Sequence, residues 1–249
     1  MGLTFPRLPL LALAAALGLA ACAAPQPGLV RVGRAEVQLP DDPRWTPLGE
    51  QASDTVTVLP GDTAHPLPMQ ARALGLRNAR GDLLAVLRVQ TNATNHPRDA
   101  TLWTLACPPQ KGVQVDDFAE GSPVRIDCLR YKRFVDGADY LAASNPDLAQ
   151  WLDANKAWPV RPYAHVSYRY STVEGGYVAV DVLADQRLLR PETHDSEAFL
   201  RAGRPVQAWM LQLRQAVQQS AAMLDGRFVV PPFPQGVPES APEPEPRTE

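Results

Sequence analysis

Residues that build metal and nucleophilic sites are scarce in this sequence. Its 249 residues include only four histidines and three cysteines. No HExxH or HxH pair occurs, no histidine stands at a zinc spacing from a cysteine, and GxSxG, Walker-type and GxGxxG motifs are missing. The pattern therefore predicts no catalytic residue, no metal site and no cofactor. The histidines are His65, His96, His165 and His194.

Neither sign of charge dominates the chain. Lys and Arg number 24 against 27 Asp and Glu, which gives a formal net charge of −3. A mildly acidic chain with mixed signs gives no support for nucleic-acid binding. The length is sufficient for a hydrophobic core in one large domain or two small ones.

The apolar run at the N-terminus is too short to span a membrane. Arg7 precedes it, and the chain from Leu8 to Ala21 is apolar apart from Pro9 and Gly18. A membrane-spanning helix needs about 20 apolar residues. A positive start, a short apolar core and small residues at its end are typical of a secretory signal. The segment therefore predicts export.

The last four residues of this segment, Leu19-Ala20-Ala21-Cys22, resemble the lipobox of bacterial lipoproteins. The resemblance implies cleavage after residue 21 and a lipid on Cys22, consisting of a diacylglyceryl group and usually an N-acyl chain such as palmitate. One acyl chain binds a membrane marginally, whereas two or more hold stably. Ala23 in place of Asp implies the periplasmic face of the outer membrane, by similarity to the enteric sorting pattern. The alternative is an ordinary signal peptide in which Cys22 is incidental.

Composition divides the chain into four parts. Residues 1–21 form the signal peptide, and residues 22–28 form a lipidated tether kept extended by Pro, Gln and Gly. Residues 29–233 are expected to form a single domain. Residues 234–249 are rich in Pro and Glu and cannot bury enough apolar surface to order themselves. This tail is therefore expected to be disordered and dispensable for folding.

Strand patterns dominate the domain. Strands are predicted at 30–40, 55–60, 69–77, 83–91, 101–107 and within 123–131, with an exposed Pro-broken loop at 61–68. Trp45 falls in a turn-rich connection and is expected to pack back as a lid on the core. Asn145-Pro146-Asp147 is a typical helix start, with Asn as the cap and Pro at the first helical position.

The clearest hairpin occupies residues 162–185. Even-numbered positions are apolar or aromatic on both of its strands, and burying both faces together sets the register. This places Tyr170 opposite Val180 and Tyr168 opposite Val182, with a three-residue loop at 174–176. His165 then lies on the polar face of its strand.

The main helix is C-terminal. Pro205 suits its first turn and Gly226 its end. One helical stripe is apolar and is expected to face the core, the alternative being a partner surface: Val206, Trp209, Met210, Leu213, Val217 and Leu224. Antiparallel strands followed by one long helix predict an α+β fold, an antiparallel β-sheet with the C-terminal helix packed on one face.

Two cysteines remain if Cys22 carries lipid. An even pair in an exported protein favours a disulfide, because the periplasm is kept oxidising. Strand alternation turns Cys107 and Cys128 inward on neighbouring predicted strands, which also favours a bridge. The alternative is two separate buried thiols.

Two functions remain open. The first is a non-catalytic envelope lipoprotein whose domain binds a protein, glycan or lipid partner. The second is a lipoprotein enzyme, hydrolase-like, with a site assembled from dispersed residues. The basic-aromatic run Leu129–Phe134 suits phosphate headgroups or glycan, although such charges on a strand commonly just face water. The loop at 61–68 and the tail are further candidate contacts.

Overall fold

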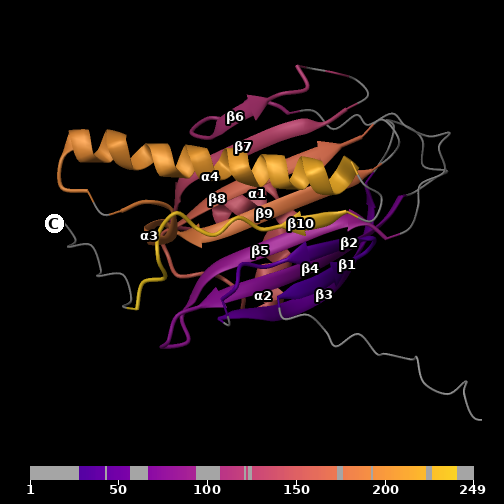
Figure 1. Cartoon of the computed structure of the whole chain (residues 1–249), viewed down its shortest axis with the longest axis horizontal. Helices are drawn as coiled ribbons and strands as arrows, with labels where there is room; N and C mark the ends of the chain where they lie inside the picture. The colour runs from indigo at the N-terminus through magenta and orange to yellow at the C-terminus, as the bar shows by residue number, and fades with distance from the viewer. Residues whose placement is uncertain are drawn as a thin grey trace, which may run out of the picture.

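A seven-stranded antiparallel sheet forms the centre of the molecule (Figure 1). The computed structural model describes residues 28–42, 44–56, 67–93, 107–120, 122, 125–172, 176–191, 193–222 and 226–239. The strand order is β3-β4-β5-β9-β8-β7-β6, and every neighbouring pair is antiparallel. The strands are β3 (Trp45–Val56), β4 (Leu67–Arg77), β5 (Leu83–Asn92), β6 (Gln114–Asp117), β7 (Asp127–Val135), β8 (Tyr163–Ser171) and β9 (Tyr177–Asp185).

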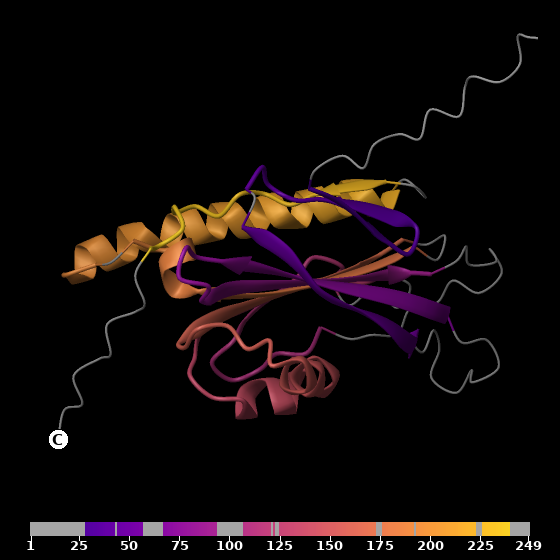
Figure 2. The same cartoon turned by 90° about the horizontal axis from the view of Figure 1, so that it is seen from below.

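One face of the sheet is covered by the long helix α4 (Ser196–Ala222) and a small second sheet (Figure 2). That sheet has the order β1-β2-β10, formed by β1 (Leu29–Val32), β2 (Ala35–Gln38) and β10 (Arg227–Val229). The helix buries the predicted stripe through Val206, Trp209, Met210, Leu213 and Val217. The predicted α+β class and the packing of the C-terminal helix are confirmed.

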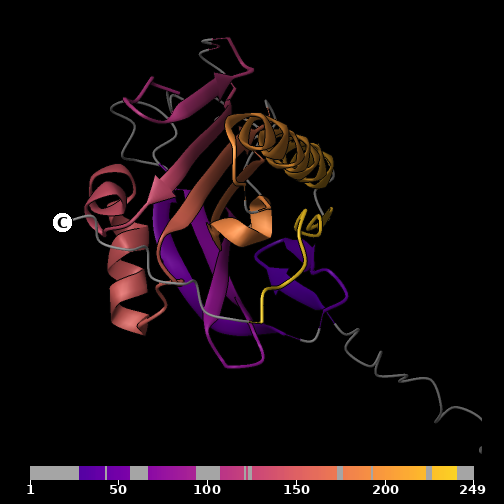
Figure 3. The same cartoon turned by 90° about the vertical axis from the view of Figure 1, so that its left-hand side faces the viewer.

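The opposite face carries two short helices, α1 (Asp139–Ser144) and α2 (Pro146–Asn155) (Figure 3). The side chain of Asn145 accepts a hydrogen bond from the backbone N–H of Leu148 at 3.3 Å, which confirms the predicted cap. Leu148, Trp151 and Leu152 are buried against β5 and β9 in a separate apolar cluster. A further one-turn helix, α3 (Gln186–Leu189), follows β9.

The N-terminal part of the domain differs from the prediction. The single strand expected at 30–40 is a hairpin of β1 and β2, turned at Gly33 and Arg34. Gly33 has φ +52°, and a Cβ there would collide with the backbone oxygen of Asn92, so only glycine suits the turn. Trp45 begins β3, which starts ten residues before the predicted strand at 55–60, and is not in a turn.

The β8–β9 hairpin has the predicted faces but another register. Tyr168 pairs with Val180 and Tyr170 with Val178, two residues away from the predicted partners. Strand pairing starts at Ser171 and Tyr177, so the connection comprises residues 172–176 and not 174–176. Within it, Thr172 N donates to Gly176 O at 2.9 Å. A shift of two residues leaves the same side chains facing the core, so burial alone does not distinguish the two registers.

Helix α4 begins nine residues before Pro205, which lies inside it. The side chain of Asp195 accepts from Ala198 N at 2.7 Å and supplies the true N-terminal cap. Pro205 removes one backbone donor within the helix, while the apolar stripe that follows it, from Val206 to Val217, packs on the sheet.

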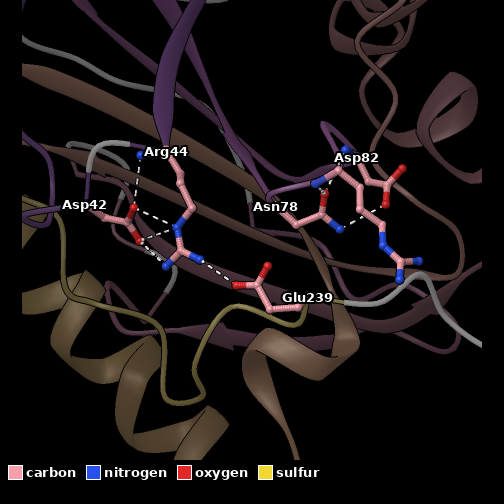
Figure 4. Close-up of polar contacts among 6 residues, drawn as sticks. Asp42, Arg44, Asn78, Asp82 and Glu239 are labelled. Atoms are coloured by element: carbon pink, nitrogen blue, oxygen red, sulfur yellow. Dashed lines mark hydrogen bonds and ion pairs between the residues drawn. The ribbon is translucent and has the colours of Figure 1, made fainter.

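The C-terminal segment follows the domain further than predicted. Gln235 N donates to Leu188 O at 3.0 Å, and Val237 packs at the margin of the main core. Arg44 Nη1 lies 3.3 Å from Glu239 Oε1 (Figure 4). Residues 234–239, which the prediction assigned to the tail, thus contact the domain. Residues 240–249, the signal peptide, Cys22 and the loop at 61–66 lie outside the described residues.

Candidate functional site

Polar side chains cross the sheet on the face that carries α1 and α2. Strand pairing places Arg88 of β5 opposite Asp181 of β9, Asp181 opposite Ser167 of β8, and Ser167 opposite Arg130 of β7. Apolar clusters lie at either end of this face, one beneath α2 and one around Cys128. Arg88, Asp181, Ser167 and Arg130 therefore form a row of polar side chains between two apolar regions, called the polar band below.

Asp181 is the centre of the band and is only 2% exposed. Its carboxylate accepts from Asn145 Nδ2 at 3.2 Å and lies 3.1 Å from His165 Nε2 and 4.0 Å from Arg88 Nη1. Burial alone raises the pKa of Asp181, but the hydrogen bond from His165 and the nearby arginine charges outweigh it. They hold the pKa of this carboxyl well below its usual range. Asp181 is therefore a buried, ionised carboxylate.

His165 is buried, at 4% exposed, and does not face water as its place on the polar strand face predicted. The reason is α1, whose Tyr140 ring meets the imidazole edge-on with the ring centroids 5.7 Å apart. Because the carboxylate of Asp181 only accepts hydrogen bonds, we assign the proton to Nε2. The hydroxyl of Tyr140, 3.3 Å from Nδ1, then donates to the other ring nitrogen.

The side chains of Tyr140, His165 and Asp181 thus form a directed hydrogen-bond chain. Tyr140 is half-buried and forms its outer end, whereas the other two members are buried. Burial raises the pKa of the Tyr140 hydroxyl, which keeps it protonated. The arrangement can pass a proton from a half-exposed hydroxyl to an imidazole that a carboxylate orients.

Three cations flank the outer end of this chain. Arg130 Nη1 donates to Pro108 O at 2.9 Å and its other terminal nitrogen to Gln110, while Lys132 Nζ donates to Gly112 O at 3.1 Å and lies 5.8 Å from the Tyr140 ring centre. Arg169 Nη1 donates to Ser167 Oγ at 2.7 Å. Burial and the charge of Arg169 lower the pKa of Arg130.

The Cys107–Cys128 disulfide borders the site. The two Cα atoms are 5.6 Å apart, so the predicted bridge is confirmed. It does not join two neighbouring strands as expected, because Cys107 lies in irregular chain before β6 and residues 101–106 lie outside the described part. The bridge ties the segment that receives the hydrogen bonds of Arg130 and Lys132 to β7.

The other predicted histidines do not join the site. His194 is exposed before α4, and His65 and His96 lie outside the described residues, as does the lipidation candidate Cys22. In the portion that the structure describes, no three His, Cys, Asp or Glu side chains gather as a metal site requires. No helix in that portion is long and apolar enough to cross a membrane.

Sequence reasoning missed the band because its residues occupy alternate, apparently solvent-facing strand positions. His165, Ser167 and Arg169 alternate with the core residues of β8, and Asp181 does so on β9. The available signal was Asp181, a lone charge amid the apolar strand YVAVDVLA. A charge there needs a partner if the second face is covered.

The chain was compared with family models, with curated proteins and with solved structures. No family model, no curated protein and no solved structure matches it.

Proposed function

We propose that this protein is a lipid-anchored protein of the bacterial envelope whose domain is a non-catalytic binding or accessory module. Cysteine usage is the observation that carries the proposal. Cys22 ends the lipobox-like segment, and the two cysteines that remain form a disulfide. A disulfide suits an exported protein, because the cytosol keeps thiols reduced and the periplasm does not.

The tether supports a function close to the membrane. Cys22 and Gly28, where the described chain begins, are six residues apart. An extended chain spans at most about 3.5 Å per residue, so the lipid and the domain are separated by roughly 20 Å or less. The domain would therefore act on partners at or near the membrane surface.

Replacing Cys22 by Ser tests the anchor. We expect the variant to accumulate as a precursor without acyl mass, whereas the wild-type chain starts at residue 22 and carries the mass of its acyl chains. Intact-mass spectrometry of membrane and soluble fractions measures both. Ala23→Ser is the matched control, because it alters the neighbouring residue and keeps the cysteine. A wild-type protein that is processed normally but has no acyl mass would contradict the proposal.

A second candidate function is an enzyme that uses acid–base chemistry, and the chain of Tyr140, His165 and Asp181 favours it. The Tyr140 hydroxyl lies 3.3 Å from His165 Nδ1, and Asp181 orients the ring from the far side. A base held by a third group is the usual arrangement for activating a hydroxyl. On this alternative Tyr140 transfers the proton and His165 stores it.

Replacing Tyr140 and His165 distinguishes the binding function from the enzyme alternative. Tyr140→Phe and His165→Gln are compared with His194→Gln, an exposed histidine away from the band, by complementation in a deletion strain. The enzyme alternative expects loss of complementation in both site variants at normal abundance and folding. The binding proposal expects Tyr140→Phe to retain function, because the change removes one hydroxyl and leaves the ring in place.

A further inference from the structure

The basic run Leu129–Phe134 lies along β7 and divides between the two faces of the sheet. Arg130 and Lys132 pair with Ser167 and His165, so both belong to the face that carries α1. Arg133 lies apart from them and packs its guanidinium over the Phe199 ring at 4.0 Å. Alternation along the strand thus separates Arg130 and Lys132 from Arg133.

Positive charge is in excess at this place. Arg130, Lys132 and Arg169 donate to carbonyl, amide or hydroxyl oxygens, and none has a carboxylate oxygen within 4.0 Å among the residues that the structure describes. The buried carboxylate behind them, Asp181, is already bonded to His165 and Asn145. Although burial opposes it, the negative charge of Asp181 raises the pKa of Arg169, so this carboxylate does not balance Arg130 and Lys132 as well.

Arg130 and Arg169 repel each other. Burial, and to a smaller extent the charge of Arg169, disfavour the charged form of Arg130 and lower its pKa. Such a cost is relieved when an anion binds between like charges. Asp117 belongs to the neighbouring strand β6. Its carboxylate accepts a hydrogen bond from the backbone N–H of Ala119, at 3.0 Å, in the turn that follows β6.

The cations are also within reach of a ligand. Arg130, Lys132, Arg169 and Tyr140 are partly exposed, whereas Asp181 and His165 behind them are buried. Lys132 also lies over the Tyr140 ring, 5.8 Å from its centre, beside the outer end of the hydrogen-bond chain. Arg130 and Lys132 therefore lie nearer the surface than Asp181 and His165, while Arg169 donates to the buried Ser167.

We infer that this surface, defined by Arg130, Lys132 and Arg169, binds the phosphate group of a ligand. The inference rests on the proposed binding function and names its ligand class. A phosphate offers up to two negative charges and several acceptor oxygens, which suits two guanidiniums and one ammonium. A carboxylate would leave more of the repulsion in place, and a neutral glycan would leave all of it.

The test is calorimetric titration of the full mature protein in detergent with inorganic phosphate at low ionic strength. We expect saturable binding in the millimolar range or tighter, and at least a tenfold weaker affinity in Arg130→Gln and in Lys132→Gln. Arg201→Gln is the matched control, since Arg201 is an exposed arginine of α4 that pairs with Glu197. Circular dichroism of each variant checks that its fold is retained.

A second titrant identifies the source of the phosphate. Dihexanoyl phosphatidic acid presents the same group on a short soluble lipid. Tighter binding than inorganic phosphate assigns the site to a lipid headgroup, and equal binding assigns it to a water-soluble phosphate. Absence of binding by both titrants, or an equal loss in Arg201→Gln, overturns the inference. Acylation of Cys22 is measured separately, so the anchor proposal can stand or fall on its own.

Discussion

Asp181 is the residue on which the polar band depends. Its carboxylate is 2% exposed and is the acceptor that His165 and Asn145 share. We expect Asp181→Asn to lower the free energy of unfolding at pH 7 by about 3 kcal/mol, because removing one partner of a buried ionic network leaves the others uncompensated. Urea unfolding followed by circular dichroism measures the loss.

The loss of stability in Asp181→Asn should depend on pH in a defined direction. The pKa of Asp181 is lower in the folded than in the unfolded protein. Its ionisation therefore stabilises the fold above the unfolded value of about 4, and this stabilisation is lost as the pH falls further. The difference between wild type and Asp181→Asn should shrink below pH 4. Asp136→Asn, at an exposed position, is the control, and a difference that stays constant with pH would contradict the assignment.

At the scale of elements, one carboxylate joins α4 to the sheet. Asp127 of β7 accepts from Tyr168 at 2.8 Å, from Arg214 Nη2 at 2.9 Å and from Gln218 Nε2 at 2.9 Å. Hydrogen bonds to a charged group contribute about 1.5–3 kcal/mol each in mutational series. The helix is thus held by a polar contact as well as by its apolar stripe.

We expect Asp127→Asn to destabilise the protein by about 2–3 kcal/mol and to speed amide exchange in the middle of α4. The neutral side chain cannot accept from all of its former donors. Glu197→Gln on the same helix is the control; it removes an exposed ion pair that is worth about 0.5 kcal/mol or less. Equal exchange rates in both variants would show that the apolar stripe alone holds the helix.

The disulfide links the irregular segment before β6 to β7, and its removal should lower the stability of the whole domain. Replacing Cys107 and Cys128 together by Ser should lower stability by about 2–4 kcal/mol, because the unfolded chain regains the freedom of the loop between them. Thermal unfolding with and without reductant measures the change. Reduced wild type should match the double variant, and a mismatch would mean that the serines disturb packing on their own.

The prediction of these elements succeeded where alternation was bounded by clear turns. The β4–β5 hairpin follows from two apolar runs separated by residues 78–82. It failed where a glycine turn interrupted an apparent strand at Gly33 and where Asp195, rather than Pro205, began the helix. The polar band was not predictable from alternation, because nothing in the strand pattern shows that α1 folds back over His165.

At the scale of the whole molecule, the C-terminal segment closes the domain. β10 pairs in parallel with β2, which belongs to the hairpin that follows the first described residue, Gly28. The Phe233 ring stacks with Trp45 and Trp209 at centroid distances of 6.3 and 5.3 Å. Residues 234–239 then continue past α3 to Arg44. The two ends of the described chain therefore stabilise the same side of the sheet.

Truncation measures what residues 234–239 contribute. A chain that ends at Phe233 loses the hydrogen bond from Gln235 to Leu188 and the packing of Val237, together worth about 2 kcal/mol. The exposed pair of Arg44 and Glu239 adds little. For a domain of this size, 2 kcal/mol corresponds to a fall in Tm of roughly 4–8 °C. A chain that ends at Glu239 is the matched control, because it keeps these contacts. Identical melting temperatures for the two truncated chains would show that the segment rests on the domain without stabilising it.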